Sequence, residues 1–142
     1  MNSSSLNPLH DLTRVEDYIE VVYELTQRKG YARSIDIAEN LGVKSSSVTV
    51  MLRKLHDMGL IVYERHRGLT LTGRGERLAK SVHERHLTIL EFLRLLGIEE
   101  AVASSDAEGI EHHVHKSTID RIARLVDYAN RHPDWFQVIN RE

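Results

Sequence analysis

The sequence predicts a mainly α-helical protein. Residues 1–72 are expected to form a winged helix-turn-helix with a small two-stranded wing, and residues 73–142 a helical domain. Two short helical stretches joined by a turn at Gly42 predict the helix-turn-helix. Two strand-like runs around a basic turn predict the wing. Helical spacing of apolar residues over 73–96 predicts a long linker helix that opens the second domain.

The elements of the first domain follow from apolar spacing and from residues that begin or end helices. The pattern predicts a helix over residues 12–28 and a short helix over 34–41, with Ser34 as its N-cap. The serines at 45–47 offer an N-cap for the next helix, and Gly59 ends it. The wing strands are expected at residues 61–65 and 69–71.

The second domain is predicted to be helical throughout. Thr72 is expected to cap the long helix and Gly97 to end it. The apolar surface of this helix exceeds what a small winged domain needs, which indicates a second copy of the chain as partner. Shorter helical stretches follow at residues 99–103, 106–115 and 117–130, with Ser117 as a candidate cap. Residues 133–142 are expected to be loosely attached, and the serines at 3–5 to lie in a mobile N-terminal arm.

Composition excludes several classes of chemistry. The 142 residues include no Cys, which excludes a disulfide scaffold, a thiolate zinc site and a cysteine nucleophile. No apolar run approaches the ~20 residues of a membrane span, and the N-terminal residues lack the apolar core of a signal peptide. We therefore expect a cytoplasmic protein with no membrane partner.

The net charge of −2 conceals an uneven distribution along the chain. Residues 28–85 carry twelve basic and six acidic side chains, whereas residues 1–27 and 86–142 each have a net charge of −4. A basic middle segment indicates a surface for a polyanion, and acidic ends indicate carboxylate clusters. Chance clustering of charges on solvated helix faces is the alternative.

The second helix of a helix-turn-helix presents its N-terminal residues to base edges in the major groove, while basic residues nearby contact phosphates. Val50 is unusual because its spacing places an apolar side chain on this outer face. It is either a contact for a thymine methyl group or a tolerated exposed residue. For each polar candidate, an ordinary solvated surface role is the alternative. The DNA-binding candidates are Tyr31, Arg33, Lys44, Ser45, Ser46, Ser47, Thr49, Arg53, Lys54, Arg65, His66 and Arg67.

A second group of residues has metal-ligand chemistry. Glu108, Glu111 and His112 are spaced i, i+3 and i+4, which places them on one face of a helix. Asp17 and Glu20 form an i, i+3 pair on the first helix, and His86 on the long helix could complete the set. Oxygen and nitrogen donors without sulfur favour Mn²⁺ or another hard to borderline divalent ion, and five or more ligands make two ions plausible. Spacing alone does not bring the first helix to the later motif, and each group alone could be a solvated face.

Several segments resemble the manganese transport regulators, the MntR branch of the diphtheria toxin repressor family. The similar segments are residues 15–20, 30–33, 36–38, 46–49, 63–71 and 108–113, within a resemblance that covers about residues 12–130. The Glu-Gly-x-Glu-His-His pattern at 108–113 is its most specific motif. The resemblance implies a winged-helix domain, a helical dimerisation domain, and a homodimer that represses transcription when metal is bound.

The resemblance also implies a ligand set, namely Asp17, Glu20, His86, Glu108, Glu111 and His112. It implies two Mn²⁺ ions per subunit, with Glu20 and Glu111 as bridges. The iron-responsive branch uses sulfur ligands where this sequence has Asp17 and Glu108, which favours manganese. Fe²⁺, Zn²⁺, Cd²⁺ and Co²⁺ are the other ions that such a site could take.

The expected function is therefore that of an Mn²⁺-activated repressor of manganese uptake genes, which binds double-stranded operator DNA as a homodimer. It would not be an enzyme and would have no small-molecule substrate. The alternatives are an Fe²⁺-responsive repressor of the same family and a metal-independent winged-helix regulator. A hydrolase with a dinuclear manganese site is a further alternative, but the sequence contains no motif that would position a nucleophile.

Overall fold

The computed structural model describes residues 8–140, and the chain divides into two compact units, residues 1–81 and 82–142. The serines at 3–5, expected in a mobile arm, lie outside the described residues. None of the described helices is both long and apolar enough to cross a lipid bilayer.

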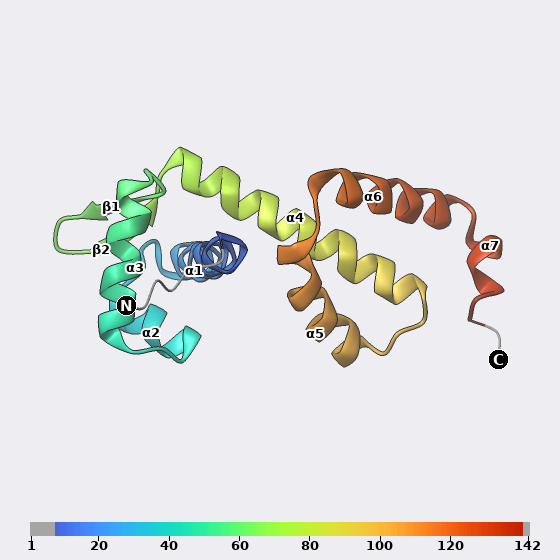
Figure 1. Cartoon of the computed structure of the whole chain (residues 1–142), viewed down its shortest axis with the longest axis horizontal. Coiled ribbons are helices and arrows are strands. Elements are labelled where there is room, and N and C mark those ends of the chain that lie inside the picture. The colour runs from blue at the N-terminus through green and yellow to red at the C-terminus, as the bar shows by residue number, and fades with distance from the viewer. Residues whose placement is uncertain (1–7, 141–142) are drawn as a thin grey trace, which may run out of the picture. The chain divides into compact units, whose positions relative to one another are not determined.

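The first unit contains the predicted helix-turn-helix and wing (Figure 1). Its first helix begins four residues earlier than expected, at a proline, which suits the first helical position because it lacks an N–H group. Its elements are α1 (Pro8–Lys29), α2 (Ser34–Leu41), α3 (Ser45–Asp57), β1 (Ile61–Glu64) and β2 (Gly68–Leu71).

One apolar core joins these elements. Ile19 and Val22 of α1, Ile37 of α2, and Leu52 of α3 are fully or almost fully buried in it together with Leu69 of β2. These residues recur at the spacing that the sequence predicted, because one face of each helix must leave water. The core therefore fixes the orientation of α3 and leaves its opposite face exposed.

The helix ends agree only partly with the predicted caps. Gly42 adopts the left-handed conformation, with φ of 63°, and ends α2 as predicted. Ser34 is the first residue of α2 and the serines at 45–47 lie within α3, so none of them is an N-cap. The N-cap positions are Arg33 and Lys44, whose backbones are extended. Thr72 is a cap as predicted, since its Oγ1 accepts a hydrogen bond from Gly75 N at 3.1 Å. That hydroxyl also donates to Gly59 O at 2.6 Å.

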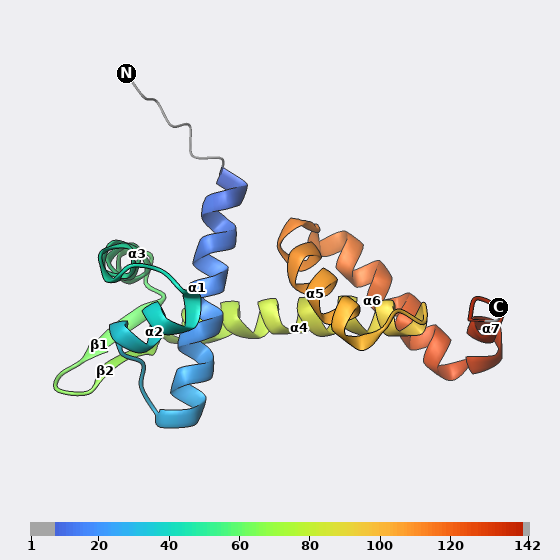
Figure 2. The same cartoon turned by 90° about the horizontal axis from the view of Figure 1, so that it is seen from below.

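The wing is an antiparallel hairpin that extends beyond the helices of its unit (Figure 2). Its strand β2 is joined to the segment before α2, because Ala32 and Leu69 exchange two backbone hydrogen bonds of 2.8 Å. Gly68 permits this approach: a Cβ atom there would lie 2.3 Å from Ala32 O, and its φ is 144°. The wing and the start of α2 are therefore one connected surface.

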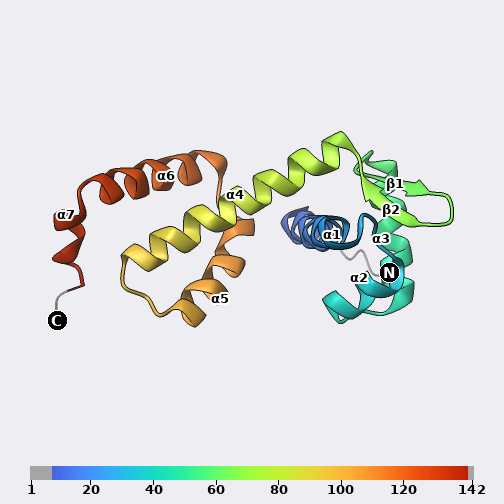
Figure 3. The same ribbon diagram turned by 180° about the vertical axis from the view of Figure 1, so that it is seen from behind.

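The second unit is built from helices (Figure 3). α4 begins in the first unit and continues into the second. Two predicted stretches, 99–103 and 106–115, are largely one helix, α5, because the serines between them do not interrupt it and Ala103 and Ala107 are both buried. The α6 cap is His115, not Ser117, and residues expected to be loosely attached include the short helix α7. The bounds are α4 Gly73–Leu95, α5 Glu100–Ile110, a 3₁₀ turn η1 Glu111–His113, α6 Lys116–Arg131 and α7 Pro133–Gln137.

A separate apolar core holds α4, α5 and α6 together. Ile89 and Leu93 of α4 pack in it with Ala103 of α5 and Ile119 of α6. At the end of α4, Arg94 forms a two-pronged ion pair with Glu100 at the start of α5. The hydrogen bond from Arg94 lowers the pKa of the Glu100 carboxyl group, although both side chains are exposed and solvent screens the pair. Val114, the residue after the turn η1, packs against this second core.

Candidate metal centre and DNA-binding surface

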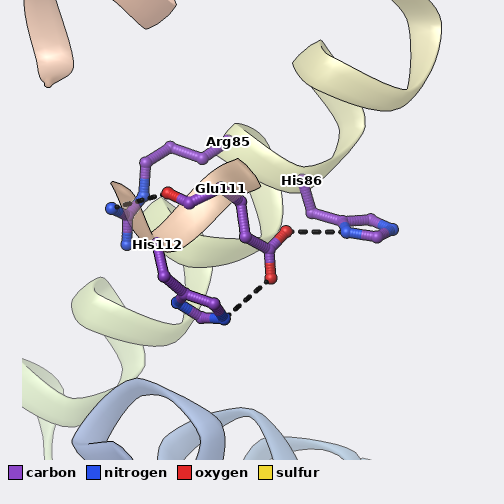
Figure 4. A network of polar contacts seen from close by, with 4 residues as sticks. All are labelled: Arg85, His86, Glu111 and His112. Atoms are coloured by element: carbon purple, nitrogen blue, oxygen red, sulfur yellow. Dashed lines mark hydrogen bonds and ion pairs between the residues drawn. The ribbon is translucent and has the colours of Figure 1, made fainter. Parts of the chain in front are cut away.

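The most buried charged side chain in the second unit is Glu111, which is 0% exposed and opens the turn η1. Its Oε2 lies 2.7 Å from Nδ1 of His86 on α4 (Figure 4). A carboxylate without solvent is costly unless it is paired or coordinated. The sequence folds this way because α5 ends at Ile110 and the chain turns toward α4.

The second oxygen of Glu111 has an unusual environment. Oε1 is buried and forms no hydrogen bond to a described residue, but it lies 3.2 Å from Nε2 of His112. The His112 side chain is only 6% exposed. A carboxylate oxygen and an imidazole nitrogen therefore converge without a hydrogen bond between them, as expected for donors that share an ion.

Arg85 supports this turn, a role that was not predicted from the sequence. Its Nη1 donates a 3.3 Å hydrogen bond to the main-chain carbonyl of Glu111 (Figure 4). The last carbonyls of a helix lack partners within the helix, so a guanidinium group can satisfy one of them. No periodicity distinguishes this arginine, and its position beside His86 is the only signal in the sequence.

The second unit brings together three of the six predicted ligands, His86, Glu111 and His112, at distances of 2.7 and 3.2 Å. Glu108 is exposed on α5 and lies outside this network. Glu111 and His112 lie in the 3₁₀ turn that directly follows α5, and not in the α-helix that the sequence predicts over residues 106–115. In the first unit, Asp17 and Glu20 are both partly buried, three residues apart on α1.

These donors fit a hard to borderline divalent ion. The network of the second unit offers carboxylate oxygen and imidazole nitrogen, and the chain has no cysteine thiolate. The buried Glu111 Oε1 is an acceptor that the described residues do not satisfy with a hydrogen bond. An ion would fit this acceptor, whose negative charge is shielded from water.

The candidate DNA-binding surface begins at α3. Ser46, Thr49 and Arg53 are exposed on this helix, opposite its buried residues. Thr49 Oγ1 donates a 3.1 Å hydrogen bond to Ser45 O, so its hydroxyl hydrogen is used within the helix. Of the other predicted residues here, Lys44 and Ser45 are exposed, and Ser47 and Lys54 are partly buried.

A second basic group lies at the wing. Arg65, His66 and Arg67 form its exposed tip, and His66 has a φ of 68°, which is uncommon for a side chain other than glycine. Arg33, before α2, donates from Nε to Arg67 O at 3.4 Å, and its guanidinium lies 5.2 Å from the centre of the Tyr31 ring. The predicted residues of the two segments are therefore neighbours.

Residues from both segments line a surface depression of about 390 Å³. Arg33, Ser34, His66 and Arg67 contribute polar groups to its lining, beside Tyr63. Basic groups around a hollow of this kind suit a phosphate of a nucleic-acid backbone.

Comparison with known proteins identifies the family. Residues 11–69 match the iron dependent repressor N-terminal DNA binding domain, and residues 72–135 match the iron dependent repressor metal binding and dimerisation domain. The chain is 51% identical over 120 residues to an HTH-type transcriptional regulator MntR of Lysinibacillus sphaericus, a match that covers 84% of this chain and 86% of that protein.

Solved structures agree. The structure of the manganese regulator SloR matches with a TM-score of 0.71 and 30% identity, over 80% of this chain. A manganese-dependent transcriptional repressor in complex with manganese matches with a TM-score of 0.69 and 29% identity, also over 80% of this chain. This chain spans about half the length of each, 54% and 53%. The two matched domains and the curated relative together show that the chain belongs to the iron-dependent repressor family of transcriptional regulators, as its motifs indicated.

Proposed function

We propose that the chain is an Mn²⁺-activated repressor of manganese uptake genes, which acts in the cytoplasm and binds operator DNA as a homodimer. The observation that carries the proposal is the buried Glu111 carboxylate between two histidines, 2.7 Å from His86 and 3.2 Å from His112. The match to a metal binding and dimerisation domain supports the dimer, and the similarity to manganese-dependent regulators supports manganese.

The proposed ligand set draws on both units. His86, Glu108, Glu111 and His112 would come from the second unit, and Asp17 and Glu20 from α1. Glu20 and Glu111 would bridge two ions in each subunit. Support comes from the matching donor chemistry, from the shared face of Asp17 and Glu20, and from the acceptor of Glu111 that lacks a hydrogen bond.

This ligand set gives a mechanism for activation. Because α1 belongs to the DNA-binding unit, ligation through Asp17 and Glu20 would restrain that unit relative to the second. A bound ion supplies the positive charge that allows several carboxylates to lie close together. Restraint in both subunits would favour recognition helices about one DNA turn apart, ~34 Å, the spacing of two half-sites. The population of the DNA-binding form would rise by no more than the differential metal affinity of the two forms.

Iron is the second candidate, because the family description names it. The residues argue against it as the preferred ion, since the sequence has no Cys and the described methionines, Met51 and Met58, pack with the first-unit core. Zn²⁺, Cd²⁺ and Co²⁺ also accept nitrogen and oxygen donors and could bind. The metal would serve regulation and not hydrolysis, in keeping with the transcriptional role of the relatives.

The experiment is DNA binding as a function of metal. A duplex is first selected from a randomised library with the full chain in Mn²⁺, and its binding is then measured by fluorescence anisotropy. Mn²⁺ should strengthen binding at least tenfold over chelator, and Fe²⁺ under anaerobic conditions should require a higher concentration. Equal affinity with Mn²⁺ and with chelator would overturn the proposal, and an equal or lower requirement for Fe²⁺ would favour the iron alternative.

A further inference from the structure

The exposed face of α3 carries one apolar side chain, Val50. It is 72% exposed, the highest fraction among the large apolar side chains that the structure describes. Its neighbours on the same face are Ser46 and Arg53, at positions i−4 and i+3, and Thr49, one residue earlier in the chain, is exposed beside them. An apolar residue thus stands in the middle of a polar strip.

Folding of the unit does not explain this residue. The contribution of α3 to the core comes from Val48, Met51, Leu52 and Leu55, which are all buried on the opposite face. A β-branched side chain also has lower helix propensity than most straight-chain residues. Val50 therefore costs some helix stability and adds no burial within the described unit.

The polar neighbours limit what this face can recognise. Arg53 provides charge for a phosphate, and Ser46 provides a hydroxyl group. The Thr49 hydroxyl hydrogen is already donated to Ser45 O at 3.1 Å, so Thr49 offers base edges a methyl group and an acceptor. Two adjacent side chains, Thr49 and Val50, therefore present methyl groups on the outer face of the helix.

The major groove of DNA has one apolar feature that distinguishes bases, the C5-methyl group of thymine. We propose that Val50 is a specificity-determining residue that contacts a thymine methyl group in each operator half-site. The proposal rests on the DNA-binding function proposed above, and it assigns Val50 to sequence preference and not to general affinity.

The test removes only the methyl group of DNA. In the duplex selected with the full chain and Mn²⁺, each thymine is replaced in turn by deoxyuridine, which keeps every hydrogen-bonding group. We expect one position in each half-site at which the replacement weakens binding about fourfold, the effect of one buried methyl group. At that position the Val50→Ala variant should bind the thymine and uracil duplexes equally.

Controls separate this proposal from the proposed function. Val138→Ala alters a valine of similar exposure, 69%, in the second unit, and should retain the full preference for thymine. If no duplex is enriched in Mn²⁺, the proposed function fails. If a duplex is enriched but uracil is tolerated at every position, or if Val50→Ala retains the preference, the role of Val50 is wrong while DNA binding stands.

Discussion

Glu111 Oε2 and His86 Nδ1 lie 2.7 Å apart, although 25 residues separate them in the chain and the carboxylate is fully buried. The contact joins the turn after α5 to the middle of α4. A glutamate or a histidine alone, in a helical protein, does not indicate a metal site. Together they form a buried acidic site with a histidine on one side and, through Oε1, a second histidine on the other.

The first prediction concerns the charge of Glu111. Glu111→Gln keeps the shape of the side chain but removes its negative charge, so metal-dependent DNA binding should be lost. Without metal the melting temperature should be unchanged or higher, because a buried carboxylate is costlier than a neutral amide. Thermal unfolding in chelator and anisotropy in Mn²⁺ measure the two effects. Glu91→Gln, exposed on α4, is the control, and a normal Mn²⁺ response of Glu111→Gln would contradict the ligand assignment.

The second prediction separates His86 from a neighbour on the same helix. His86→Ala removes an imidazole that lies beside Glu111, so the Mn²⁺ concentration for half-maximal DNA binding should rise about tenfold or more. His83→Ala, which alters an exposed histidine less than one turn earlier, should leave that concentration unchanged. Titration of Mn²⁺ at a fixed DNA concentration compares the half-maximal Mn²⁺ concentrations of the two variants. Equal responses of the two variants would exclude His86 as a ligand.

Much of this site follows from the sequence, because residue chemistry and helical spacing are local properties. Asp17 and Glu20 do share a face of α1, and His86 does lie on the long helix. The transition after Ile110 could not be predicted, since it depends on contacts distant in sequence: Arg85 hydrogen-bonds the Glu111 carbonyl, and the Glu111 carboxylate meets α4. The α-helix predicted over residues 106–115 therefore missed the 3₁₀ turn that follows Ile110.

The ends of the helices also include some that the sequence predicted correctly and some that it did not. The wing was predicted from its two strand-like runs, and the start of α4 from the capping role of Thr72. The caps at Ser34 and Ser45 were not correct, because a serine one position inside a helix has the same local composition as a serine at its boundary. Arg33 and Lys44, whose backbones are extended, take the N-cap positions instead.

The third prediction concerns metal preference. Asp17→Met replaces a hard oxygen donor with a soft thioether, so the preference for Mn²⁺ over Fe²⁺ should fall. Anaerobic DNA-binding titrations with each metal give the ratio of half-maximal concentrations for the variant and the parent chain. Asp17→Asn, which keeps an oxygen donor, should weaken both metals with less change in their ratio. An unchanged ratio in Asp17→Met would remove Asp17 from the selectivity argument.

The fourth prediction concerns the junction of the wing with α4. Thr72→Ala removes the hydroxyl that accepts from Gly75 N at 3.1 Å and donates to Gly59 O at 2.6 Å. Loss of an N-cap costs roughly 1–2 kcal/mol, so the free energy of unfolding should fall by about that amount. Urea unfolding of metal-free protein measures it. Thr88→Ala, in the interior of α4, should change stability by under ~0.5 kcal/mol, and equal losses in both variants would argue against the cap.

The fifth prediction links backbone geometry to DNA binding at the wing. Gly68→Ala would place a Cβ atom 2.3 Å from Ala32 O, at a φ of 144°, so the two hydrogen bonds between Ala32 and Leu69 could not both persist. Strain of this kind costs ~1–3 kcal/mol. It would move the wing away from Arg33, so DNA affinity at saturating Mn²⁺ should fall, while the Mn²⁺ requirement stays the same because the predicted ligands are distant in sequence. Gly73→Ala, whose Cβ would meet only the flexible end of Arg77 at 3.5 Å, is the matched control for both measurements. A Gly68→Ala protein with normal stability and DNA affinity would show that the wing does not need this close backbone contact.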